Sequence, residues 1–103
     1  MDQTNTKRRQ TLLKLRKLFR RNGYLRVPNT VGRQVDRQQY KKGYEVRFVA
    51  LTESELGDIQ SLLRRAGVKM GRPFSKHNQI VQPVYGKKVV AGLCEMLRIK
   101  MDS

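Results

Sequence analysis

The chain has 103 residues, of which 23 are Lys or Arg and 8 are Asp or Glu, so its formal net charge is +15. This length allows one domain with a core of modest size, and an apolar content of 38% is too high for a purely disordered basic tail. The excess of positive charge predicts a polyanionic partner, with nucleic acid first and an anionic membrane surface second.

Cysteine and histidine usage excludes several kinds of site. Cys94 and His77 are the only residues of their types, so neither a disulfide framework nor a thiolate zinc site is expected, and we expect no metal and no cofactor. No apolar run approaches the length of about 20 residues that spans a membrane. The polar start of the chain is unlike a secretory signal, which favours a cytoplasmic or nucleoid-associated protein. Residues 7–21 share the Arg-rich, acid-free composition of a mitochondrial presequence, but they lack Ser and Ala.

The positive charge is unevenly distributed. Residues 1–43 hold 13 Lys and Arg against 2 acids, whereas residues 44–103 hold 10 against 6. We therefore predict that the chain divides into a basic N-terminal helix and flexible basic loop over residues 1–43 and a compact α+β domain over residues 44–103.

The first predicted element is a helix from Lys7 to Asn22, ended by Gly23 in a left-handed conformation. Its leucines recur at intervals of three and four residues and form one apolar stripe. The other faces carry cations with no interleaved acid: Lys7, Arg8, Arg9, Lys14, Arg16, Lys17, Arg20 and Arg21. The first three of these cations oppose the helix dipole, so their placement favours binding of phosphates over helix stability.

Residues 24–43 extend the predicted binding region. Tyr24 to Pro28 is expected to be a short edge strand because Pro28 stops it, and Asn29 to Gly43 is expected to be a flexible loop that orders on binding. The candidate contacts to phosphates and base edges here are Arg26, Arg33, Arg37, Lys41 and Lys42, with Tyr40 as a ring on which a base can stack. The alternative is a charged linker without a binding role.

The compact part begins with an alternating strand from Tyr44 to Ala50. The next helix starts at Thr52, which together with Glu55 forms a predicted capping box, and ends at Gly67 in a Schellman motif.

Two further strands and a helix complete the predicted domain. The strands are Val68–Met70 and Gln79–Tyr85, and Pro83 suggests that the second is an edge strand or is bulged. The basic connection between them contains Arg72, Lys76 and His77, which are either a second nucleic-acid contact or a solvated turn. A last helix is expected from Lys87 to Lys100. The predicted fold is α+β: a basic N-terminal helix followed by a small β-α-β-β-α two-layer domain.

Catalytic groups are few. Most of the acids lie at a helix start or near the ends of the chain, and the spacing of Asp36 and Glu45-Val46-Arg47 is only loosely like that of some nucleases. We therefore predict a non-enzymatic nucleic-acid-binding protein that favours RNA over DNA, with a ribonucleoprotein particle or a larger protein as a further partner. The alternatives are a regulatory or mobile-element DNA-binding protein, a metal-dependent nuclease, and a basic adaptor for an acidic protein or a membrane.

Overall fold

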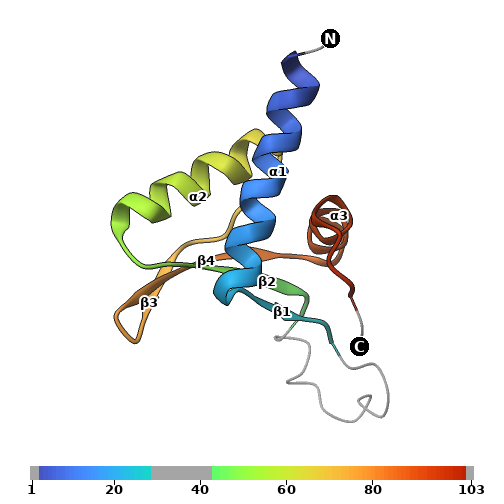
Figure 1. Ribbon diagram of the computed structural model, residues 1–103. Coiled ribbons are helices and arrows are strands. Elements are labelled where there is room, and N and C mark those ends of the chain that lie inside the picture. The colour runs from blue at the N-terminus through green and yellow to red at the C-terminus, as the bar shows by residue number, and fades with distance from the viewer. Residues whose placement is uncertain (1–2, 29–42, 102–103) are drawn as a thin grey trace.

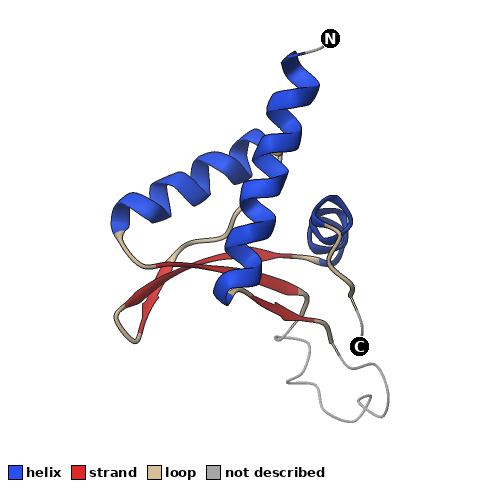
Figure 2. Ribbon diagram, viewed as in Figure 1, coloured by secondary structure: helices blue, strands red, loops and turns tan. Residues whose placement is uncertain are grey.

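The computed structural model describes residues 3–28 and 43–101. The described elements are α1 (Gln3–Asn22), β1 (Tyr24–Arg26), β2 (Glu45–Ala50), α2 (Glu53–Arg65), β3 (Phe74–Lys76), β4 (Gln79–Tyr85) and α3 (Lys87–Leu97). The four strands form one antiparallel sheet in the order β1-β2-β4-β3. All three helices lie on one side of this sheet, so the molecule has two layers (Figures 1 and 2). The predicted α+β class with an N-terminal helix is therefore confirmed.

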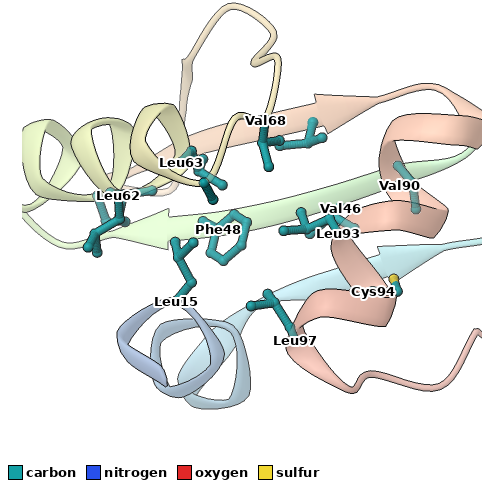
Figure 3. Packing of buried hydrophobic residues seen from close by; sticks show 14 residues of the cluster. Leu15, Val46, Phe48, Leu62, Leu63, Val68, Val90, Leu93, Cys94 and Leu97 are labelled. Carbon is teal, nitrogen blue, oxygen red and sulfur yellow. The ribbon is translucent and has the colours of Figure 1, made fainter. Parts of the chain in front are cut away.

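The hydrophobic core lies between the sheet and the three helices. β2 turns Val46, Phe48 and Ala50 inward, as the alternation of its sequence predicted, and all three are fully buried. Leu15 of α1 and Leu63 of α2 pack around Phe48 (Figure 3). The lone cysteine, Cys94, is buried on α3, which raises the pKa of its thiol. One core thus joins α1 to the rest of the fold.

α1 crosses the inner face of the sheet between α2 and α3 (Figure 1). Its Leu15 is fully buried, and the Phe19 ring meets the Phe48 ring edge-on with centroids 6.2 Å apart. Gly23, which ends the helix, is not left-handed as the sequence suggested. Its amide donates to the Phe19 carbonyl at 2.7 Å, and a Cβ at this position would lie 2.7 Å from that same oxygen. Glycine is therefore required here by a close approach.

The ends of α2 follow the sequence prediction closely. The Glu55 amide donates to Thr52 Oγ1 at 3.1 Å, but the Glu55 carboxylate accepts from the amide of Leu51 at 2.9 Å, one residue before the position expected for a capping box. At the other end Gly67 is left-handed, and the amides of Gly67 and Val68 donate to the carbonyls of Arg64 and Leu63. This is the predicted Schellman motif.

The strand predicted at Val68–Met70 is absent, and a strand lies at Phe74–Lys76 instead, inside the segment expected to be a connection. β3 and β4 are joined by the two-residue turn His77-Asn78, where both residues have positive φ, 50° and 65°. This turn geometry matches the twist of a hairpin, and asparagine tolerates it better than most residues. The sequence lacks the usual Asn-Gly signal for such a turn, so the hairpin was missed.

Pro83 lies in a central strand, because β4 pairs with β2 on one side and with β3 on the other. The prediction of an edge strand is therefore wrong. Pairing with β3 ends at Val81, and the Pro83 carbonyl beyond it accepts from the Gly71 amide at 2.9 Å. Since the nitrogen and carbonyl of one residue face the same neighbour in an antiparallel ladder, the missing N–H of Pro83 costs no bond to β2.

α3 runs from Lys87 to Leu97, three residues shorter than expected, because Arg98 adopts a left-handed conformation with φ of 57° and ends the helix. Among the described helices, none combines the length and the apolar character needed to cross a membrane.

Candidate nucleic-acid interface

The cations of α1 cover the outer side of the helical layer. Seven of them have no acid within ion-pairing distance among the described residues: Lys7, Arg8, Arg9, Lys14, Arg16, Lys17 and Arg20. Arg16 is half-buried and the other six are exposed. We call these seven residues, together with Arg65 of α2 and Arg98 after α3, the helical basic surface.

Open grooves flank α1 on both sides. The groove toward α3 is lined by Arg8, Arg9, Arg16 and Arg98, and Leu12, Leu13 and Met96 supply its apolar part. The groove toward α2 is lined near the start of α1 by Lys7, Arg8, Lys14 and Arg65. A phosphate in either groove would be within reach of cations from two elements, an arrangement that a single isolated helix does not provide.

Arg21 differs from the other cations of α1. Its guanidinium donates to both carboxylate oxygens of Glu55, at 2.7 and 2.9 Å, and to the carbonyl of Val49 at 2.9 Å. Hydrogen bonds from Arg21 and from the Leu51 amide lower the pKa of Glu55 to about 2. Arg21 therefore ties the end of α1 to the start of α2, which is a structural role.

A second polar surface lies on the opposite side of the sheet, which none of the described helices covers (Figures 1 and 2). We call it the open sheet face. Tyr24 of β1 and Tyr85 of β4 are about half exposed there, at 47% and 51%. By strand register, Arg47 and Val49 of β2 share this face with Val81 of β4. Aromatic rings and arginines on one solvent-facing sheet are suited to contact with bases.

Glu45 organises the arginines of the open sheet face. Its carboxylate has 3% side-chain exposure and accepts from Arg26 Nη1 at 3.1 Å and from Arg47 Nε at 2.9 Å. The Arg47 guanidinium carbon lies 5.5 Å from the centre of the Tyr24 ring and 5.4 Å from that of Phe74. Hydrogen bonding to Glu45 raises the pKa of Arg47 above its ordinary value. Arg47 is thus held by an acid at one edge and by two rings.

A hollow of about 530 Å³ opens on this face beside Arg47. Its apolar part is formed by Val49 and Val81, which are cross-strand neighbours. The remaining lining residues are Tyr24, Arg26, Arg47, Lys76, His77 and Gln79. The hollow falls within the size range of small-ligand sites, and it combines an apolar floor with several hydrogen-bonding groups.

The structure divides the residues predicted from the sequence between two opposite faces. The α1 cations lie on the helical side, whereas Arg26, Lys76 and His77 line the hollow in the sheet. Arg72 is exposed on the segment between α2 and β3, outside both groups. Five of the predicted binding residues lie outside the described ranges: Arg33, Arg37, Tyr40, Lys41 and Lys42. The candidate acid Asp36 lies outside them as well.

Sequence reasoning missed the centre of the open sheet face. It did not select Tyr24, Arg47 or Phe74 as binding residues, and it considered Glu45 only as a possible metal ligand. The available signal was the alternation of β2, which placed Glu45, Arg47 and Val49 on the side away from the core. Which side chains of the other strands join them depends on strand order and register, and these come only from the fold.

Within residues 3–28 and 43–101, no cluster of three or more His, Cys, Asp or Glu side chains could hold a metal ion. No protein-family model, no curated protein and no solved structure matches this chain.

Proposed function

We propose that this protein binds nucleic acid, with RNA favoured over DNA, and that the helical basic surface holds the phosphates. The observation that carries the proposal is the set of seven α1 cations without an acidic partner among the described residues. Cations placed for stability alone would be expected to pair with acids or to complement the helix dipole. α1 begins at Gln3, four residues before the predicted start, so Lys7, Arg8 and Arg9 lie beyond its first turn and do not oppose the helix dipole as the sequence suggested. Of the seven cations only Arg20 lies in the last turn, where it complements the dipole, and the other six neither pair with a described acid nor complement the dipole.

The flanking grooves support contact with an extended phosphate backbone. Cations line α1 along most of its length, and Arg65 and Arg98 widen the charged surface toward α2 and α3. Each phosphate that these side chains neutralise releases condensed counterions, which is the main source of affinity in binding that does not depend on sequence.

The preference for RNA is supported by the open sheet face. Exposed rings at Tyr24 and Tyr85 offer stacking surfaces, and stacking requires unpaired bases. Recognition of unpaired, splayed bases is common in RNA-binding proteins, whereas the bases of duplex DNA are stacked on one another. RNA bound on this face and RNA bound on α1 would contact opposite sides of the protein.

The test replaces five exposed, unpaired cations of α1 in one variant: Lys7→Gln, Arg9→Gln, Lys14→Gln, Lys17→Gln and Arg20→Gln. Arg21 is kept because its ion pair with Glu55 is structural. We expect the affinity for a single-stranded RNA to fall on the order of 100-fold, measured by fluorescence anisotropy at fixed salt.

A matched control removes the same charge elsewhere. Arg64, Lys69, Lys87, Lys88 and Lys100 are also exposed, and changing all five to Gln should alter affinity far less. Equal losses in the two variants would refute a role for the helical basic surface. Single-stranded DNA, duplex DNA and duplex RNA of the same sequence complete the comparison, and tighter binding to either form of DNA than to single-stranded RNA would reverse the proposed preference.

A further inference from the structure

The hollow on the open sheet face is lined by Arg47, whose guanidinium contacts one acid and two aromatic rings. Three sides of the Arg47 guanidinium are occupied: the Tyr24 and Phe74 rings lie near its carbon, and Glu45 accepts from Nε at 2.9 Å and from Nη2 at 3.4 Å. An arginine has five N–H donors in a planar fork. Among the residues that the structure describes, the end formed by Nη1 and the remaining N–H of Nη2 has no hydrogen-bond partner, so it is left for a ligand.

Glu45 anchors both arginines of the open sheet face. Its side chain is almost fully buried under Arg26 and Arg47, and each arginine donates to it. One buried carboxylate between two guanidinium groups leaves a net positive charge at the surface of the sheet. Because the rings and the acid fix the plane of Arg47, little side-chain entropy remains to be lost when a ligand binds its free end.

The groups around Arg47 define the ligand chemistry. Two adjacent acceptors in one plane suit the free fork, and a flat apolar surface suits the floor made by Val49 and Val81. Guanine offers both, since its O6 and N7 atoms form the acceptor pair that arginine binds most often in nucleic acids. Lys76, His77 and Gln79, from the end of the β3–β4 hairpin, line the same hollow and supply further polar groups.

We propose that this hollow binds an unpaired guanine of an RNA strand through the free fork of Arg47, with Glu45 as the residue that positions Arg47. The proposal rests on the proposed function, because the helical basic surface is taken to hold the backbone of the same RNA, which has to pass around an edge of the sheet to reach the hollow on the opposite side. It adds a preference for one base, which phosphate contacts alone do not produce.

The first experiment uses the unaltered protein, so it does not depend on the folding of a variant. Oligouridine strands carry one central guanosine, inosine, 7-deazaguanosine or adenosine, and their affinities are compared by fluorescence anisotropy. Guanosine and inosine keep both acceptors, whereas 7-deazaguanosine lacks N7 and adenosine lacks O6. We expect the first two to bind about 10-fold more tightly than the last two, as the loss of a bidentate contact implies.

Variants then assign the preference to Arg47. Arg47→Lys keeps the positive charge but not the two parallel N–H donors. The affinity for the guanosine strand should therefore fall to that for the adenosine strand, while the affinity for plain oligouridine should not change. Glu45→Gln should reduce the same preference without removing it, because the fork remains but is less firmly held. Circular dichroism melting identifies any variant that does not fold. Lys69→Gln, an exposed change away from the hollow, is the control and should leave the preference intact.

The outcomes separate this proposal from the proposed function. If all four strands bind equally and with strong salt dependence, the guanine site is refuted and the general binding function stands. If no strand binds, both are refuted. Two further results would overturn the assignment to an unpaired base in RNA. One is that free guanosine monophosphate binds as tightly as the oligouridine with a central guanosine. The other is that this guanosine binds equally well when it is paired in a duplex.

Discussion

Gln82 is a fully buried polar side chain whose hydrogen bonds connect three segments of the fold. Its Nε2 donates to the carbonyls of Gly71 at 2.7 Å and Pro83 at 3.0 Å, and its Oε1 accepts from Gln60 at 2.8 Å. The side chain thus joins α2 and the segment before β3 to the centre of β4. A buried polar side chain with all its hydrogen bonds made favours one arrangement of the chain, because another arrangement would leave a buried polar atom without a partner.

Replacing Gln82 by Met should destabilise the protein by about 2–3 kcal/mol, since the volume is nearly kept but the carbonyl of Gly71 loses its donor. Urea denaturation followed by circular dichroism measures the change. A loss below about 0.5 kcal/mol, the range of an ordinary surface substitution, would contradict this role.

Gly23 and Gly57 give a matched pair of glycine substitutions. An Ala at Gly23 would place Cβ 2.7 Å from the Phe19 carbonyl oxygen, whereas a Cβ at Gly57 would meet nothing within 4 Å apart from its chain neighbours and the surrounding backbone of α2. We expect Gly23→Ala to lower the free energy of unfolding by about 1–3 kcal/mol. Gly57→Ala, within α2, should raise it by up to about 1 kcal/mol. Thermal melts of both variants test the pair. If Gly23→Ala leaves the free energy of unfolding unchanged, the close approach to Phe19 does not require glycine at this position.

At the scale of elements, one ion pair connects α1 to α2. Arg21 binds both oxygens of Glu55, and Glu55 also accepts from the Leu51 amide just before α2. The pKa of Glu55 is lowered to about 2, against about 4.3 in an unfolded chain. Since the folded state binds this proton less readily, the contribution is present above pH 4.3 and is lost as the pH falls toward 2.

Glu55→Gln should therefore cost about 1 kcal/mol of stability at pH 7, the upper range for a partly exposed pair. The difference from the unaltered protein should shrink between pH 4.3 and pH 2. Glu53→Gln, an exposed acid in the same helical turn, is the control and should show a smaller difference. Denaturant unfolding across this pH range measures the difference in unfolding free energy. A difference that stays constant down to pH 2 would contradict a stabilising ion pair.

Elements with local signals could be predicted from the sequence, and elements defined by pairing could not. The cap at Thr52 and the Schellman end at Gly67 depend on neighbouring residues, and both were found where expected. β3 has only three residues and exists because His77-Asn78 folds it back onto β4. The central position of Pro83 likewise follows from strand order, which no single segment encodes.

For the whole molecule, the described candidate binding residues lie on two opposite faces, with Arg72 as the exception. The sequence identified the α1 cations because they occur together along one helix. It could not bring Lys76 and His77 together with Arg26, Tyr24 and Arg47, since these residues come from β1, β2, β3 and the β3–β4 turn, which meet only in the folded sheet. The predicted division at residues 1–43 and 44–103 stays a prediction; in the structure, Leu15 is part of the core that the later residues form, and Leu25 packs against that core.

We propose that the position of the α1 cations, more than the net charge of +15, gives the protein its affinity for nucleic acid. The most direct measurement is the salt dependence of affinity for a single-stranded RNA, compared between the unaltered protein and the variant with five α1 cations changed to Gln. If six or more phosphates are contacted, the log–log slope should be about −4 or steeper. It should become shallower by roughly 3 in the α1 variant and hardly change in the control variant with the same net charge. An affinity of the unaltered protein that does not change with salt, or equal slopes in the two variants, would contradict a phosphate-binding role of the α1 cations.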